Sequence, residues 1–247
     1  MPPKSVGIIG YGQFGQFVTT LVQRFFSDVE LRICGGRNAT AEEWRHTATA
    51  DVVVVCVPIA HYQQTLNRLA DSIAEHTIVL DVATVKGITT EWFQTNQQFS
   101  GRYICTHPMF GPASYQKTGG DITGFRIVVT DHNLPPEQYQ AICTLLDTLG
   151  FRIITMDADA HDRYLAETLF LTHFLAQTVT AANFVRTDID TVSFGFLMDA
   201  VESVRDDVAL FRDVYQHNPH CDTVLRRLRE AGTQVEQTLY KDTATEM

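Results

Sequence analysis

The first spacing of chemically useful residues lies near the start of the chain, where six residues fit the pattern G-x-G-x-x-G: Gly10, Tyr11, Gly12, Gln13, Phe14 and Gly15. They follow a short apolar run and open a stretch with helical spacing. In that context the first glycine permits a tight turn, the second lets a pyrophosphate approach the backbone, and the third permits close packing of helix on strand. The alternative is a glycine-rich turn without a ligand, but the flanking elements favour dinucleotide binding.

The end of the second expected strand indicates which dinucleotide binds. Proteins that bind NAD commonly hold the ribose 2′-hydroxyl with an Asp or Glu about 20 residues further on. No acid stands there, since the sequence reads Leu31-Arg32-Ile33-Cys34-Gly35-Gly36-Arg37-Asn38. A guanidinium matches the geometry of a phosphate group. We therefore expect Arg37 to bind the 2′-phosphate of NADP, with NAD less favoured; a solvated loop arginine is the alternative.

Two further polar segments follow apolar strands. His107 stands at the start of His107-Pro108-Met109-Phe110-Gly111-Pro112, and Thr84 and Lys86 come shortly after Asp81. Ligands of open α/β sheets bind beyond the carboxyl ends of the strands, so we expect these side chains in one cleft with Gly10. A histidine with a pKa near ~6.5 can take a proton at neutral pH. The alternatives are a structural imidazole for His107 and a surface lysine for Lys86.

An α/β fold would hold these side chains. To about residue 156, short β-branched runs alternate with helical stretches, which is typical of a parallel sheet covered by helices. We predict a doubly wound, Rossmann-type domain over residues 1–156, with helices at Phe14–Phe26, His61–Glu75 and Pro136–Leu149 and a left-handed C-cap at Gly150. The expected strands are Ser5–Gly10, Leu31–Gly35, Val52–Val57, Thr77–Asp81, Tyr103–Thr106, Arg126–Thr130 and Arg152–Met156.

Residues 157–247 have helical spacing throughout, which predicts an all-helical second domain. The stretch Tyr164–Leu175 is apolar nearly all round a helix. Such a helix must be buried, and a domain of this size cannot easily enclose it alone. We therefore expect a homodimer formed through the C-terminal helices.

Composition excludes several classes of function. The net charge is −10, from 19 Lys and Arg against 29 Asp and Glu, which disfavours nucleic acid and anionic lipid as partners. No apolar run is long enough to cross a membrane. The five cysteines are odd in number and lie in separate segments, as expected of thiols in a reducing compartment. The first residues lack the layout of a secretory signal, so we expect a cytoplasmic protein.

Taken together and in this order, the glycine motif, Asp81–Lys86, His107–Pro112, His161-Asp162 and His173 resemble the prephenate and arogenate dehydrogenase family of tyrosine biosynthesis, most closely its NADP-using arogenate dehydrogenases. The resemblance implies that His107, assisted by Thr84, withdraws a proton from the ring hydroxyl of arogenate or prephenate. Hydride then passes to the nicotinamide while the ring carboxylate leaves as CO2.

The resemblance also implies further contacts. We expect Lys86, Met109, Gly111, His173 and Arg205 to bind the substrate. Cofactor contacts are expected from Val57, Pro58 and Thr84 besides the glycine motif and Arg37. His161-Asp162 is interpreted as a structural contact at the head of a helix, with a satisfied helical histidine as the alternative for both His161 and His173.

One position departs from the family pattern. Many microbial members place a substrate-binding arginine ten residues before the arginine of a hydrophobic-Arg-Asp step, and counting back from Arg212 gives Glu202. Either Arg205, Arg163 or Lys86 replaces that arginine, or the pocket prefers arogenate, whose ammonium tolerates an acid. We favour arogenate.

Two other functions remain open on the sequence alone. One is an NADP-dependent dehydrogenase of β-hydroxy acids or an imine reductase, for which Arg163 and Glu167 are the nearest candidate catalytic groups. The other is a silent NADPH sensor, against which the His107 and Thr84 pair speaks. The segment His217–Cys221 is interpreted as a surface turn, and no metal site is expected.

Overall fold

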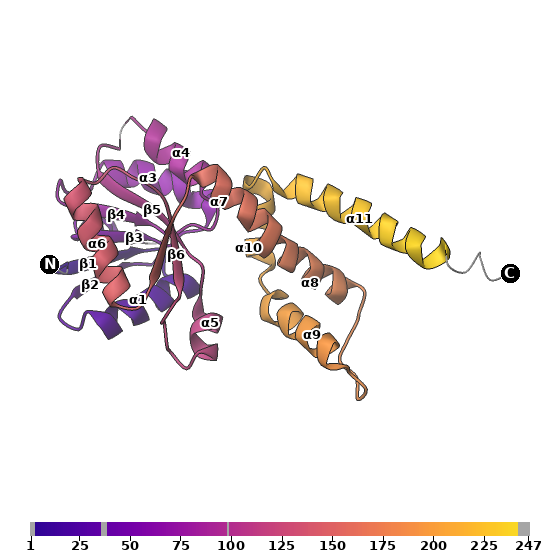
Figure 1. Ribbon diagram of the computed structural model, residues 1–247. Coiled ribbons are helices and arrows are strands. Elements are labelled where there is room, and N and C mark those ends of the chain that lie inside the picture. The colour runs from indigo at the N-terminus through magenta and orange to yellow at the C-terminus, as the bar shows by residue number, and fades with distance from the viewer. Residues whose placement is uncertain (1–2, 36–38, 98, 242–247) are drawn as a thin grey trace. The chain divides into compact units, whose positions relative to one another are not determined.

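The computed structural model describes residues 3–35, 39–97 and 99–241, and the chain divides into two compact units, Met1–His161 and Asp162–Met247 (Figure 1). The sequence placed the change of pattern at residues 156 and 157, a few residues earlier. The division falls inside one helix, α7 (Ala158–Leu165).

The first unit contains a seven-stranded sheet in the order β2-β1-β3-β4-β5-β6-β7 within the described residues. Strands β1 to β5 are parallel, β6 is antiparallel to β5, and β7 is parallel to β6. The strands are β1 (Ser5–Ile9), β2 (Glu30–Cys34), β3 (Val52–Val55), β4 (Ile78–Asp81), β5 (Arg102–Pro108), β6 (Arg126–His132) and β7 (Arg152–Thr155). The predicted doubly wound sheet is confirmed as a mostly parallel one.

The antiparallel step at β6 corrects the expectation of a parallel sheet. A parallel pair requires a crossover that returns the chain to the starting edge, usually through a long helix. Between β5 and β6 the structure has the short helix α5 (Pro112–Lys117), and β6 runs back beside β5 in the opposite direction. β5 also extends through His107 and Pro108, whereas the sequence placed them in a loop after the strand.

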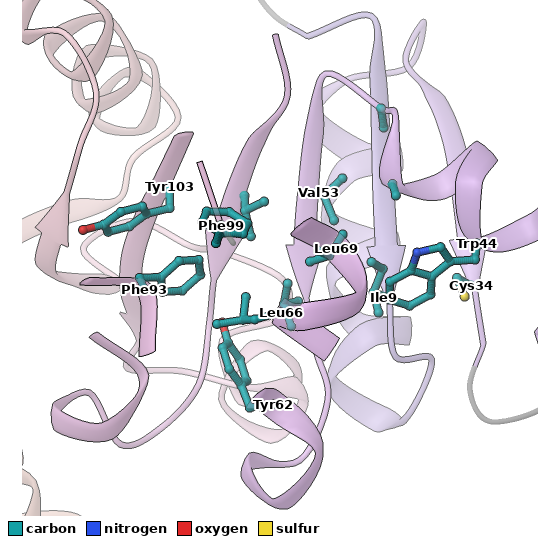
Figure 2. Packing of buried hydrophobic residues seen from close by; sticks show 14 of the residues in the cluster. Ile9, Cys34, Trp44, Val53, Tyr62, Leu66, Leu69, Phe93, Phe99 and Tyr103 are labelled. Carbon is teal, nitrogen blue, oxygen red and sulfur yellow. The ribbon is translucent and has the colours of Figure 1, made fainter. Parts of the chain in front are cut away.

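Helices cover both faces of the sheet, as alternation of side chains along the strands requires. On one face, Val53, Val55 and Val79 pack with Trp44, Leu66 and Phe93 in the cluster drawn in Figure 2. On the other face, Ile8 and Val54 pack against apolar residues of α1. The helices of this unit are α1 (Gln13–Phe25), α2 (Ala41–Ala48), α3 (Tyr62–Ala70), α4 (Gly87–Thr95), α5 and α6 (Pro136–Thr148), with a 3₁₀ turn at Ile59–His61.

Helix α6 ends as predicted, with Gly150 at a φ of +102°. Helix α2 was not predicted, although its start carries a sequence signal. The Thr40 hydroxyl accepts the backbone N–H of Glu43 while the Glu43 carboxylate accepts the backbone N–H of Thr40, which forms a capping box. Predicted helix His61–Glu75 ends earlier, at Ala70.

The second unit is helical, as predicted. Its helices are the end of α7, a π-helical turn at Ala166–Phe170, α8 (Leu171–Ala181), α9 (Val192–Val204), α10 (Val208–His217) and α11 (Cys221–Lys241). Phe170 is fully buried and stacks on Phe211 and Tyr215. Among the described residues, no helix is both long enough and apolar enough to span a membrane.

Candidate active site

The glycine motif forms the turn between β1 and α1. Gly10 has a φ of +93°, and a Cβ there would lie 2.6 Å from the Cys56 carbonyl oxygen. A Cβ on Gly15 would lie 2.1 Å from the Gly10 carbonyl oxygen, so both positions exclude any side chain. A Cβ on Gly12 would meet nothing within 4 Å, which leaves open space at the start of α1. The turn therefore fits a pyrophosphate, which would approach the backbone at Gly12 and the helix N-terminus.

The carboxyl ends of four neighbouring parallel strands meet at this edge of the sheet. Because the order is β1-β3-β4-β5, the glycine turn after β1, Val57 and Pro58 after β3, Thr84 after β4 and His107 at the end of β5 lie along one edge. The chain also reverses its winding between β1 and β3, the switch point at which open α/β sheets bind ligands.

His107 is a buried titratable group at this edge. Its side chain is 6% exposed, and its Nδ1 lies 2.9 Å from Nε2 of His161, which is 3% exposed. Burial, and then the charges of His161 and Lys86, holds the pKa of His107 well below its usual value of 6.5. The imidazole is therefore neutral near pH 7, which is the state that accepts a proton.

Lys86 is not open to a ligand in this structure. It is fully buried, and its ammonium donates to the carboxylate of Asp81 and, at 2.7 Å, to the carbonyl oxygen of Thr106. Asp81 also accepts the hydroxyl of Thr89 at 3.0 Å and the backbone N–H of Ala83 at 2.8 Å. This network joins β4 to β5 through Lys86 and Asp81, which favours a structural role for Lys86 in fixing the loop after β4 over a contact with a ligand.

The other predicted residues of the first unit lie near the surface. Met109 is 39% exposed, and its backbone N–H donates to the carbonyl oxygen of Arg126. Gly111 caps the start of α5, and a Cβ there would meet nothing within 4 Å. Tyr11 is 38% exposed and Thr84 is half-buried. Arg37 lies outside the described residues.

In the second unit, His173 is 4% exposed and follows the π-helical turn. Its Nδ1 lies 2.9 Å from the carbonyl oxygen of Leu169, so Nδ1–H donates and Nε2 is left as an acceptor. That buried Nε2 has no hydrogen-bond partner within the part of the chain that the structure describes. Arg205 ends α9 and lies 3.9 Å from the carboxylate of Asp206.

Glu202 is paired inside the second unit. Both of its carboxylate oxygens accept hydrogen bonds from Arg186, at 2.8 and 3.0 Å, and Arg186 also donates to Asp199 at 2.6 Å. The Arg186 guanidinium lowers the pKa of Glu202. No local sequence pattern indicated this partner, because Arg186 stands in the connection between α8 and α9.

The segment His217–Cys221 was interpreted from the sequence as a surface turn, but it contains buried residues. Asn218 is 2% exposed and donates through Nδ2 to the carbonyl oxygen of Asp162 at 2.7 Å. No group of three or more His, Cys, Asp or Glu in the described residues is arranged to hold a metal ion.

The sequence analysis did not predict the contacts that His161 and Asp81 make at the candidate site. His161 was interpreted as a helix contact, but it reaches the ring of His107, which is 54 residues earlier. Asp81 was quoted only as part of a motif, but it is the buried partner of Lys86. The only sequence signals were a polar pair at the head of a helix and an acid at the end of an apolar strand.

Comparison with known proteins gives a family match over 26–155, to the model described as prephenate dehydrogenase, nucleotide-binding domain. Two chloroplastic relatives come from Arabidopsis thaliana. Arogenate dehydrogenase 2 is 25% identical over 95% of this chain and 70% of its own length. Arogenate dehydrogenase 1 is 24% identical over 97% of this chain, but the chain spans only 40% of that relative.

Solved structures show the same fold. The prephenate dehydrogenase of A. aeolicus in complex with hydroxyphenyl propionate and NAD+ has a TM-score of 0.76 at 14% identity, covering 100% of this chain and 94% of that one. Synechocystis arogenate dehydrogenase has a TM-score of 0.69 at 20% identity, covering 98% and 94%.

Proposed function

The chain belongs to the prephenate and arogenate dehydrogenase family, and from that premise we propose that it catalyses the oxidative decarboxylation of arogenate or prephenate with NADP, as a step of tyrosine biosynthesis. One observation carries the proposal beyond the family match. His107, a histidine whose pKa is held low by burial, stands at the end of β5 on the same sheet edge as the open glycine turn. A base and a place for a dinucleotide are thus available at one edge.

The cofactor would be held by the backbone of Gly10–Gly15 and the N-terminus of α1, with Val57, Pro58 and Thr84 beside it. Open space at Gly12 supports this assignment. The choice of NADP over NAD rests on the sequence, because no acid ends β2 and Arg37 follows it. When bound, the oxidised nicotinamide supplies a hydride acceptor.

His107 supplies the proton chemistry. Hydride can leave the ring carbon only as its hydroxyl O–H bond breaks and a C=O bond forms, so Nε2 of His107 takes that proton. Loss of the ring carboxylate as CO2 returns an electron pair to the ring, and the oxygen regains the proton as a phenol. Thr84, after the neighbouring strand, offers a hydroxyl that can orient the imidazole or the substrate.

Of the expected substrate contacts, we propose Met109 and Gly111 in the first unit here, while His173 and Arg205 of the second unit rest on the family resemblance alone. Within the second unit, Nε2 of His173 is an orphaned acceptor that a hydroxyl, amide or ammonium donor would satisfy. Lys86 is assigned to the loop instead, because its ammonium is already engaged by Asp81 and Thr106.

Arogenate is the favoured substrate. The names of the Arabidopsis relatives support it. Glu202 does not support this preference, because its carboxylate is paired with Arg186 and is not free to meet a substrate ammonium.

We also propose that two copies associate through the second unit. Its exposed large apolar residues support this association, since scattered single residues are ordinary but a concentration of them marks an interface. They include Phe184 at 62%, Val185 at 60%, Ile189 at 89%, Val192 at 77% and Phe196 at 70% exposed.

The test is the absorbance of reduced nicotinamide formed by purified protein given arogenate or prephenate, each with NADP and then with NAD. We expect turnover with both nucleotides offered at saturation, with NADP and arogenate giving the highest kcat/KM. No turnover with any of the four pairs, by protein that still binds NADPH, would refute the proposal.

A further inference from the structure

Two buried imidazoles meet where β5 ends. His107 lies on that strand and His161 on α7, and their rings meet edge to face with planes 72° apart. Nδ1 of His107 and Nε2 of His161 are 2.9 Å apart, a hydrogen-bond distance. Both side chains are more than nine-tenths buried, so water does not compete for this bond.

A bond between two ring nitrogens requires that one donates and the other accepts. A neutral imidazole carries a single N–H, so the two directions leave His107 in different states. If Nδ1–H of His107 donates, its Nε2 keeps a lone pair and can take a proton. If Nε2–H of His161 donates, Nε2 of His107 carries the hydrogen and cannot act as a base. The direction of one hydrogen bond therefore decides whether His107 can perform its chemistry.

We propose that His161 is a positioning residue for His107: its Nε2 accepts the Nδ1–H of His107 and so selects the tautomer with a basic Nε2. This inference rests on the function proposed above. When Nε2 of His107 takes the hydroxyl proton, an O–H bond breaks and an N–H bond forms. The resulting imidazolium is stabilised through Nδ1–H by His161, and the same proton returns to the oxygen when the ring becomes aromatic.

An imidazole in this place acts differently from a carboxylate. Both would accept Nδ1–H, but a carboxylate would favour the protonated base and raise its pKa. The titratable groups that act on His107 are His161 from α7 and Lys86 from the connection between β4 and α4, and both lower its pKa after burial itself. A side chain at position 161 that accepts the hydrogen bond but can never take up a proton therefore raises the pKa of His107.

Two substitutions separate these roles. His161→Gln keeps an acceptor, the amide oxygen, but cannot carry a proton. His161→Leu keeps bulk but has no acceptor. His76→Gln is the matched control, because His76 is 61% exposed and pairs only with Asp51 among described residues.

The first readout needs no turnover: imidazole ¹⁵N chemical shifts of the nucleotide-free protein report the tautomer of His107. We expect the Nδ1–H form in the unsubstituted protein and in His161→Gln, and a mixture in His161→Leu. The second readout is kinetic. We expect kcat of His161→Leu to fall by roughly 10²–10⁴-fold with little change in KM, and His161→Gln to lose less than about tenfold while the acid limb of its pH profile moves upward.

A ¹⁵N spectrum showing the Nε2–H form of His107 in the unsubstituted protein would overturn the inference. So would a His161→Gln variant as impaired as His161→Leu with an unmoved acid limb, because that pattern indicates packing alone. If the tautomer of His107 is as expected but neither arogenate nor prephenate is turned over, the proposed function fails and this inference does not. If turnover occurs with the wrong tautomer, only this inference fails.

Discussion

The proposed chemistry depends on His107, whose buried imidazole is neutral near pH 7. Because the pKa of His107 is lowered by burial, His161 and Lys86, the group stays unprotonated at and above 6.5. A base works in its unprotonated form, so kcat/KM is expected to stay level down to that pH and to fall only below it. A pH profile of kcat/KM checks this, and an acid limb centred at or above 6.5 would contradict it.

Removing the imidazole tests its role more directly. We expect His107→Asn to lower kcat by roughly 10²–10⁴-fold while binding of NADPH, followed by fluorescence titration, stays within a few fold. His132→Asn, on the neighbouring strand β6, is the matched control and is expected to turn over normally. Equal losses in the two variants would show that His107 has no special part.

Lys86 connects the ends of β4 and β5 through its contacts with Asp81 and Thr106. Removing one partner of a fully buried ion pair leaves the other uncompensated, so Lys86→Met, which leaves Asp81 without its cation, should destabilise the protein by about 3–5 kcal/mol. Chemical denaturation measures the loss, and Lys117→Met on exposed α5 is the control. A free energy of unfolding unchanged in Lys86→Met would show that the pair contributes nothing.

The sequence predicted which residues lie at the carboxyl edge of the sheet, but not which side chains they pair with. His107, Thr84 and the glycines follow strands, and strand order alone brings them together. The burial of Lys86, the contact of His161 and the pairing of Glu202 by Arg186 depend on side chains from distant segments. No local pattern encodes such partners.

Among the elements, the turn from β1 into α1 contains two glycines with different roles: Gly15 is required by close packing, whereas Gly12 borders open space. Gly15→Ala would drive a Cβ into the Gly10 carbonyl, and we expect a loss of about 1–3 kcal/mol in stability. Gly12→Ala meets no atom, so its thermal stability should be unchanged while its affinity for NADPH falls, because the methyl group occupies the space where the pyrophosphate would approach. Denaturation and nucleotide titration of both variants distinguish the roles; equal nucleotide affinity of Gly12→Ala and the unsubstituted chain would contradict the assignment.

Elements with strong periodicity were predicted well and short ones were not. The central strand Val52–Val55 and helix α6 match their expected positions closely, because continuous apolar runs and a C-cap glycine are local signals. The direction of β6 is not a local property, because it depends on the path that the chain takes between β5 and β6. Helix α2 could have been found from Thr40 and Glu43, the capping box at its start.

At the scale of the whole molecule, the exposed apolar residues of the second unit predict self-association. The stretch Tyr164–Leu175 was expected to be buried, yet Tyr164 is 53% and Leu175 39% exposed in the single chain. We expect sedimentation to give a dimer, and Phe196→Glu to weaken it because a carboxylate at an apolar interface is costly to desolvate. Gln140→Glu, on exposed α6 of the first unit, is the control. A monomer at micromolar concentration would rule out the proposed dimer.

The proposed reaction is an oxidation coupled to loss of CO2, in which His107 is the base. We would test it by following reduced nicotinamide, CO2 and the aromatic product together in one reaction of arogenate or prephenate. We predict equal amounts of all three from the unsubstituted protein, and a common fall of all three rates in His107→Asn. Reduced nicotinamide without CO2 and aromatic product, or an undiminished rate in His107→Asn, would contradict it.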